Sequence, residues 1–214
     1  MDTTIYLIRH GESLGNKKTI FLGQTDWDLS EKGYAQAECI PDAFDGISVD
    51  VVISSDLCRA LHTAQPLARK LGMEIQRNPD FREIDAGAWE GQPFETLIKN
   101  YPESYCRIWR QDIGHARPDE GESVAQLADR VWGALQKTAE QYAGKTVVIA
   151  THATPIRTVM TRLLGYPLEE ASRVPWVANA SVTKLTCREG SFQLEYADSC
   201  KHLEGLVTRF SGNV

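Results

Sequence analysis

The sequence contains no long hydrophobic segment and no excess of basic residues. Its longest apolar runs, Ile5–Ile8 and Val147–Ala150, have four residues each. A membrane-spanning helix needs about 20 apolar residues, and a signal peptide also needs a longer apolar core. The 214 residues include 29 acidic and 23 basic ones, which gives a net charge of −6. A general nucleic-acid binder would need a basic face to displace counterions. We therefore expect neither a nucleic-acid partner nor a membrane partner.

Cysteine occurs in an odd number and in no arrangement typical of a metal site. The five cysteines include no C-x-x-C pair. Disulfides are typical of oxidising compartments, whereas free thiols of this kind indicate a reducing one. The sequence thus predicts a cytoplasmic chain whose core is large enough to fold without disulfides or metals.

Short β-branched segments alternate with segments of helical period along most of the chain. Strands are predicted at 4–8, 49–54, 73–76 and 146–151, and a C-terminal hairpin at 181–187 and 192–197. Helices are predicted from Ser30 towards Phe44, from the N-cap Asp56 to Leu71, from the N-cap Ser123 through Leu135, and from about Pro155 to Leu164.

This alternation predicts one α/β domain over residues 1–214. The expected fold has three layers, in which helices cover both faces of a mainly parallel sheet. Residues 93–118, called the cap below, break the alternation and are rich in aromatic residues and arginines. We expect the cap to be a small helical insertion over one edge of the sheet. The alternative is a helical hairpin that only packs on the body of the protein.

Ionisable side chains follow each of the four predicted parallel strands. Arg9 and His10 follow the first strand, and Arg59 lies one turn into the helix after the second. Glu83 follows the third strand and His152 the fourth. Because the carboxyl ends of parallel strands meet at one edge of a sheet, we expect these five side chains to converge there.

The convergent side chains are of the types that phosphoryl transfer requires. Guanidinium groups bind phosphate oxygens through paired N–H donors, and helix N-termini add backbone donors. A neutral imidazole can attack phosphorus and hold it covalently, and a second imidazole, when protonated, can stabilise the equatorial oxygens. A carboxylic acid can protonate the departing alkoxide. Because no Asp-rich cluster accompanies these groups, we expect no metal and no other cofactor.

Several sequence blocks, taken in order, resemble the histidine phosphatase superfamily, whose fold is called phosphoglycerate mutase-like. The blocks are R-H-G-E-S at 9–13 with Asn16, S-S-D-L-C-R-A at 54–60, R-E-I-D-A-G-A-W-E-G at 82–91, G-E-S at 121–123 and T-H at 151–152. The resemblance implies that His10 is the phosphorylated nucleophile and Glu83 the proton donor. It also implies a phosphate pocket formed by Arg9, Arg59 and His152 and lined by Asn16 and the backbone of Gly23.

Two departures from the family pattern bear on the activity. Family members usually have glycine after the second histidine, where a backbone N–H approaches phosphate. This chain has Ala153 there, and we expect the same N–H to bind substrate. Mutases usually follow the acid with Tyr-Gly and an arginine pair, whereas here I-D-A-G follows at 84–87, which is closer to the phosphatase branches. The resemblance therefore implies hydrolysis of a small phosphorylated metabolite without metal.

Four alternative functions use some of the same residues. A cofactor-dependent phosphoglycerate-type phosphomutase would need the same pocket, and a regulatory module would bind phosphate without turnover. The segment G-E-S-L-G at 11–15 matches the nucleophile elbow of serine hydrolases, but no helical period follows it at once. The pair His10-x-Glu12 occurs in zinc deaminases, which also need a downstream P-C-x-x-C that this sequence lacks.

The remaining histidines and tryptophans are expected to be mainly structural. His62, His115 and His202 have no predicted partner at ligand spacing, although His115 in the cap could contact substrate. The tryptophans at 89, 132 and 176 are expected in the core. The chain could also form a homodimer.

Overall fold

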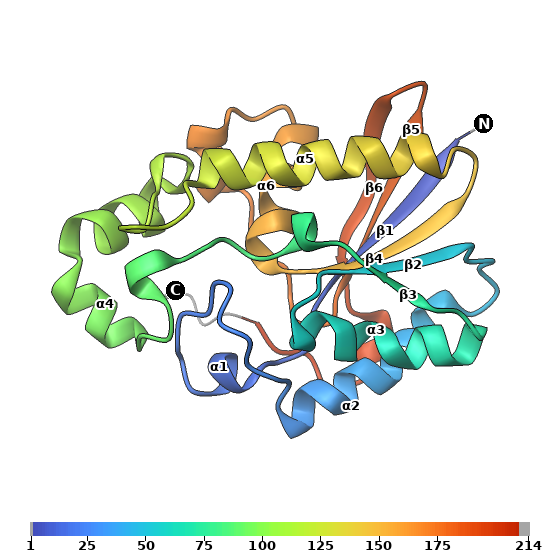
Figure 1. Cartoon of the computed structure of the whole chain (residues 1–214), viewed down its shortest axis with the longest axis horizontal. Coiled ribbons are helices and arrows are strands. Elements are labelled where there is room, and N and C mark those ends of the chain that lie inside the picture. The colour runs from blue at the N-terminus through green and yellow to red at the C-terminus, as the bar shows by residue number, and fades with distance from the viewer. Residues whose placement is uncertain (1, 210–214) are drawn as a thin grey trace.

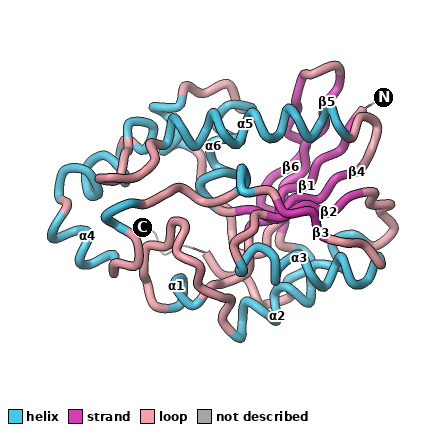
Figure 2. The backbone as a smooth tube through the Cα atoms, in the orientation of Figure 1, coloured by secondary structure: helices cyan, strands magenta, loops and turns pink. Residues whose placement is uncertain are grey.

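The structure is a computed structural model that describes residues 2–209, except for the side chains of residues 106–108. A six-stranded sheet in the order β3-β2-β4-β1-β5-β6 forms its centre (Figures 1 and 2). The strands are β1 (Thr3–Arg9), β2 (Val51–Ser54), β3 (Ile75–Arg77), β4 (Thr146–Thr151), β5 (Val182–Arg188) and β6 (Ser191–Ser199). The first four strands are parallel to one another, β5 is antiparallel to β1, and β6 is antiparallel to β5. The predicted α/β class with a mainly parallel sheet is confirmed.

Helices cover both faces of this sheet (Figure 1). The helices α5 (Val124–Gln141) and α6 (Ala153–Leu163) lie on one face, and α2 (Glu31–Cys39) and α3 (Cys58–Leu71) lie on the other. Successive residues of a strand point to opposite faces. Leu7 and Ile149 accordingly pack in the core beneath α5 and α6, whereas Ile8 and Val148 pack in the core beneath α2 and α3.

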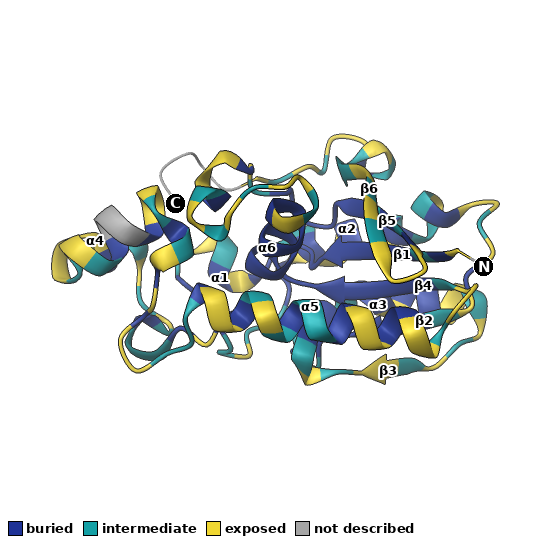
Figure 3. Ribbon diagram, turned by 90° about the horizontal axis from the view of Figure 1, so that it is seen from above, coloured by how far each residue is buried: buried dark blue, intermediate teal, exposed yellow. Residues whose placement is uncertain are grey.

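Burial on both faces explains the uninterrupted apolar runs of the two central strands. Figure 3 shows the sheet interior and α6 almost wholly buried, while α5 exposes its outer side. None of the described helices is long and apolar enough to cross a membrane.

Ser30 and Ser123 are the N-cap residues of α2 and α5, as predicted. Ser30 Oγ accepts a hydrogen bond from Gly33 N, and Ser123 forms a capping box with Gln126. The prediction that Asp56 caps α3 is wrong, because Leu57 is the N-cap residue and makes no side-chain cap. The Asp56 carboxylate instead accepts a hydrogen bond from Arg82 Nε at 2.6 Å. At the other end of α3, Gly72 adopts a left-handed conformation with φ of 65°, as a glycine C-cap does.

Several predicted boundaries differ from the structure by a few residues. The strand predicted at 49–54 begins at Val51, and the one predicted at 73–76 covers Ile75–Arg77. The helix predicted to reach Phe44 ends at Cys39 and continues as a 3-10 helix over Ile40–Phe44. Pro41 explains this change, because its ring and missing N–H disfavour continuation of the α-helix. The helix expected from about Pro155 starts at Ala153, with Pro155 in its first turn.

The cap lies beyond the carboxyl ends of the parallel strands (Figure 1). It contains α4 (Phe94–Asn100), a π-helical segment (Pro102–Trp109) and a 3-10 turn (Ile113–His115). Tyr105 and Trp109 are buried and make edge contacts with Phe21 and Trp89. Such aromatic pairs contribute beyond their buried area. The short helix α1 (Leu14–Lys17) belongs to the loop that carries Phe21, so this loop and the cap pack on one another.

Candidate active site

The five predicted catalytic side chains meet at the carboxyl edge of the sheet. Arg9 ends β1 opposite Thr151, which ends β4, so His10 and His152 lie next to each other. Their ring centroids are 5.1 Å apart. The side chains of Arg9, His10, Arg59 and Glu83 line one pocket, while His152 lies behind His10 and is fully buried. The fold thus assembles residues from four segments far apart in the sequence.

The surroundings of His10 favour a neutral imidazole with its proton on Nδ1. Its Nδ1 lies 2.7 Å from the carbonyl oxygen of Gly11, which can only accept, so Nδ1 carries the proton and Nε2 keeps a lone pair. Burial, with the positive charges of Arg59 and Arg9, lowers the pKa of His10 well below its usual value. The imidazole is therefore neutral at neutral pH.

Two buried guanidinium groups supply positive charge beside His10. Arg59 donates to the carbonyl oxygens of Thr25 and Gly23 at 2.9 and 2.6 Å. Arg9 donates to the carbonyl oxygen of Val177 at 2.6 Å. Burial lowers the pKa of Arg9 to about 10, so the group stays charged at neutral pH. Carbonyl acceptors orient the two guanidinium groups but do not neutralise their charge. The positive charge therefore stays available to bind an anion.

The surroundings of His152 favour its neutral form. Its Nε2 lies 2.9 Å from Ser55 Oγ, and its buried Nδ1 has no hydrogen-bond partner among the described residues. Burial, with Arg59 and the neighbouring His10, lowers the pKa of His152 well below its usual value. The imidazolium considered from the sequence is therefore disfavoured until a phosphate dianion supplies a compensating negative charge. Ser55, which follows β2, was not among the predicted site residues.

Glu83 is a buried carboxyl group held by two backbone N–H groups. Its Oε1 accepts from Ile84 N at 2.9 Å and its Oε2 accepts from Thr154 N at 3.2 Å. Burial raises the pKa of Glu83, and these hydrogen bonds and Arg59 oppose the shift only in part. Desolvation thus favours the neutral carboxylic acid.

Three further predicted binding residues have different surroundings. Asn16 lines the pocket, and because its Oδ1 accepts hydrogen bonds from Ser13 N and Asn179 Nδ2, its NH₂ group can donate to a ligand. Ala153 also lines the pocket, with no positive φ, so the family's glycine is not needed for the backbone here. Gly23 is not a lining residue.

The glycine at position 23 has a packing role. Its N–H donates to Glu90 Oε2 at 3.2 Å, and a Cβ there would lie 2.4 Å from the carbonyl oxygen of Ile84. Only glycine allows the loop to approach the segment after Glu83 this closely.

Apolar side chains line the rest of the pocket and were not predicted from the sequence. They are Ile20, Phe21, Leu22, Phe94 and Trp176, called the apolar wall below. Trp176 was expected in the core, as Trp89 is, but lies in the wall with the Arg157 guanidinium 4.1 Å from its ring centroid. The aromatic content of the cap could have indicated Phe94 as a lining residue. Trp176 lies outside the regular elements, so no sequence period indicated its position. His115 is exposed and pairs with Asp112.

Ser13, the serine of the elbow-like segment, lines the pocket as the N-cap of α1. Its hydroxyl accepts a hydrogen bond from Asn16 N at 3.1 Å. Within residues 2–209, no histidine hydrogen-bonds to this hydroxyl. The arrangement gives no general base to a serine nucleophile.

The fold and the pocket define an enzyme that acts on phosphate esters. A sequence profile of the histidine phosphatase superfamily (branch 1) matches residues 5–199. The chain belongs to the histidine phosphatase superfamily.

Known proteins similar to the chain include both phosphatases and mutases by name. The chain is 33% identical to phosphoserine phosphatase 1 of Hydrogenobacter thermophilus over 166 residues, and this alignment covers 78% of each chain. It is 30% identical over 209 residues to probable phosphoglycerate mutase GpmB of Yersinia pestis, 94% of each chain. The solved structure of Bacillus stearothermophilus YhfR superimposes with a TM-score of 0.89 at 28% identity, over 94% of this chain and 99% of that one. The predicted class, a phosphoric monoester hydrolase, is confirmed by the family and the phosphatase relative.

Proposed function

We propose that the protein hydrolyses a small phosphomonoester through a phosphohistidine at His10, without a metal ion. The observation that carries the proposal is that one pocket holds His10, whose pKa burial lowers, and Glu83, whose pKa burial raises, beside two guanidinium groups. The phosphoserine phosphatase among the relatives supports hydrolysis.

The reaction proceeds in two displacements at phosphorus. Nε2 of His10 forms a bond to phosphorus while the bond to the ester oxygen breaks, and that oxygen takes the electron pair and the proton of Glu83. A water molecule then attacks the phosphohistidine, gives a proton to the Glu83 carboxylate and releases phosphate and His10. Arg9 and Arg59 hold the phosphoryl oxygens in both steps.

The lining of the pocket supports a substrate whose leaving group is uncharged and partly apolar. Among the described lining residues, the arginines are Arg9 and Arg59 at the phosphate end, and the opposite side is the apolar wall. The described side chains of the apolar wall carry no charge themselves, so they favour an apolar leaving group over one with a second anionic group. We therefore expect higher kcat/KM for aryl and alkyl phosphates than for phosphoserine or 3-phosphoglycerate.

The intermediate provides the test of the proposal. After rapid quenching during turnover of a ³²P-labelled substrate, label should be bound to nitrogen, stable to base and labile to acid. His10→Ala should fold normally and lose both label and turnover, and activity should survive exhaustive chelation. An acid-stable phosphoester on Ser13, or activity lost with EDTA and restored by Zn²⁺ or Mg²⁺, would overturn the mechanism.

The mutase and the non-catalytic module remain the competing functions, and one assay separates all three. The mutase relative covers almost the whole chain, but the residues after Glu83 are Ile84 and Asp85, and the described side chains of the apolar wall are uncharged. Release of free phosphate from a substrate panel supports the phosphatase. Isomerised product in the presence of a bisphosphorylated cofactor would indicate a mutase, and no turnover a binding module.

A further inference from the structure

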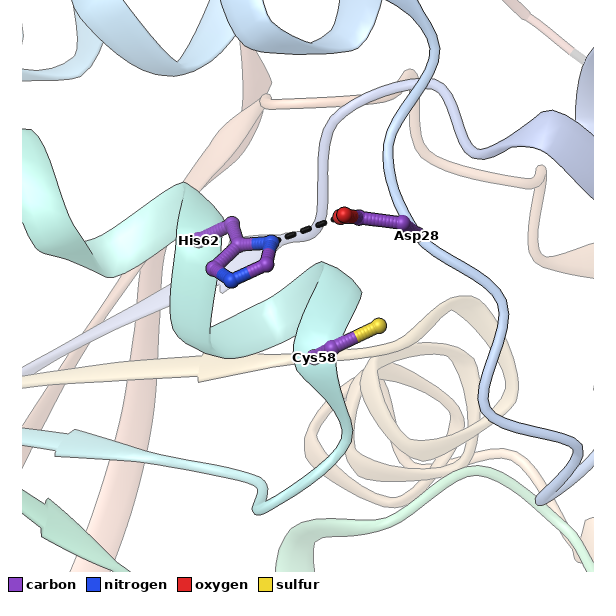
Figure 4. Close-up of side chains that lie close together, drawn as sticks. All are labelled: Asp28, Cys58 and His62. Carbon is purple, nitrogen blue, oxygen red and sulfur yellow. Dashed lines mark hydrogen bonds and ion pairs between the residues drawn. The ribbon is translucent and has the colours of Figure 1, made fainter.

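We propose that Asp28, Cys58 and His62 form a binding site for Zn²⁺ on the surface next to the phosphate pocket. One ligand atom from each of these residues, a carboxylate oxygen, Sγ and an imidazole nitrogen, lies within 4.8 Å of the other two. Figure 4 shows the side chains of Cys58 and His62 on α3 beside the loop that carries Asp28. Oxygen, sulfur and nitrogen together form the mixed donor set that zinc accepts.

Two of the three ligands are already paired in the sequence. Cys58 and His62 are four residues apart in α3, so they lie one above the other on the same face of the helix. The expectation that His62 lacks a partner at ligand spacing is therefore wrong. The third ligand, Asp28, is brought in by a loop 30 residues earlier in the chain, which sequence spacing could not reveal.

The loop is held in place at Asp28 and at the residues just before it. The carbonyl oxygen of Asp28 accepts a hydrogen bond from Leu14 N at 2.9 Å. The Asp26 carboxylate accepts one from Cys58 N at 2.7 Å. Arg59 fixes the loop further along, at Thr25. A site whose ligands are positioned beforehand loses little entropy when an ion binds.

A neighbouring side chain orients one ligand of the cluster by a hydrogen bond, and solvent reaches the cluster. Tyr34 OH donates to Asp28 Oδ2 at 2.8 Å, while Oδ1 accepts from Leu29 N at 2.7 Å and lies 2.6 Å from His62 Nδ1. Outer partners of this kind orient ligating carboxylates. The side chains of His62 and Asp28 are 28% and 41% exposed, so an ion can enter from solvent, and water can complete a four-coordinate shell. The Asp26 carboxylate adds negative charge nearby.

Zinc at this site would not be the metal of the reaction. The ligands belong to the outer side of the loop and of α3, and among the described residues none of the three lines the phosphate pocket. The ion would join loop and helix directly beside Arg59, which donates to Thr25 and Gly23 of the same loop. Its binding can therefore be measured without any assay of turnover.

Optical titration of the full chain with Co²⁺ tests the site. Reduced, chelator-treated protein should bind one equivalent of Co²⁺ with a visible spectrum of tetrahedral type and a near-ultraviolet thiolate band, and Zn²⁺ should displace it. Cys58→Ser should remove the thiolate band, and His62→Ala should weaken binding about 10-fold or more. Cys39→Ser, another partly buried thiol on a helix, is the matched control and should bind like the parent.

Two further variants separate this site from the catalytic pocket. His10→Ala should keep the full cobalt spectrum, because that imidazole lies in the other site, and circular dichroism should show that each variant is folded. No stoichiometric binding by the parent, or binding that survives in both Cys58→Ser and His62→Ala, would overturn the proposal. Neither result depends on whether the protein is a phosphatase.

Discussion

Burial shifts the pKa values of His10 and Glu83 in opposite directions. The pKa of His10 is lowered and that of Glu83 is raised, so the pH range in which one is neutral and the other protonated widens. The rate of His10 phosphorylation should fall at low pH as His10 protonates and at high pH as Glu83 ionises. Stopped-flow or quench measurements across pH provide the profile. Glu83→Gln should lose the alkaline limb that belongs to Glu83, and a profile unchanged in this variant would assign that limb to another group.

The leaving group determines how much the acid of Glu83 contributes. Glu83→Ala should slow phosphorylation by alkyl phosphates by roughly 10²–10⁴-fold, the usual contribution of a positioned acid. Nitrophenyl phosphate, whose leaving group departs without a proton, should lose much less. Single-turnover rates of both substrates measure the difference, since breakdown of the phosphohistidine needs Glu83 as a base in either case. Equal losses would mean that Glu83 only positions phosphate.

At the scale of the elements, α5 fixes the segment that carries the acid. Arg130 donates from Nη1 to the carbonyl oxygens of Asp80 and Arg82, at 2.9 and 3.2 Å, and from Nη2 to Glu122 at 2.7 Å. Arg130→Met should free this segment and lower single-turnover rates with alkyl phosphates about 10-fold or more, because small misplacements of a catalytic group are costly. Rates with nitrophenyl phosphate should change less. Arg69→Met, which removes an exposed pair with Glu38, is the matched control; an equal loss there would deny Arg130 a positioning role.

Helices, strands and caps were predictable from the sequence where interactions between residues close in the chain determine them. The sheet, the serine caps and the glycine C-cap follow from side-chain period and backbone preference, and the convergence of His10 with His152 follows from parallel strands. The apolar wall was not predictable, because Trp176 lies in an irregular segment whose position depends on tertiary packing. Asp56 fitted a cap by residue type, but its ion pair with Arg82 depends on a contact across 26 residues. Such contacts leave no periodic signal in the sequence.

At the scale of the whole molecule, the buried imidazoles make stability depend on pH. The folded-state pKa values of His10 and His152 lie below the unfolded value of about 6.5. The unfolded chain therefore binds more protons as the pH falls below about 6.5, and stability is lost towards the lowered folded values. Glu83 has a raised pKa, so its contribution to stability falls as the pH rises above about 4.3. This effect of one carboxyl group opposes that of two imidazoles.

Denaturant unfolding at pH 7.5 and 5.5 checks this prediction. The free energy of unfolding should fall with pH by up to about 1.4 kcal/mol per pH unit for each fully shifted imidazole. His10→Gln should have a shallower pH dependence, whatever its absolute stability. His115→Gln, which removes an exposed histidine, should not flatten the dependence. An identical slope in His10→Gln and the parent would show that His10 does not titrate on unfolding.

The position of the two imidazoles directly after the two central strands has a consequence for hydrogen exchange. β1 and β4 have strand neighbours on both sides and helices on both faces, so their amide protons should exchange with solvent only through global unfolding. The amides of α4, where most residues are exposed, should exchange through smaller local openings. The groups proposed to bind phosphate would then lie beside the most stable strands, whereas part of the surface that contacts the leaving group would lie in the less stable α4. A molecule that has opened only at the cap keeps its phosphate-binding groups in place while it loses Phe94, and with it part of the surface that selects among substrates.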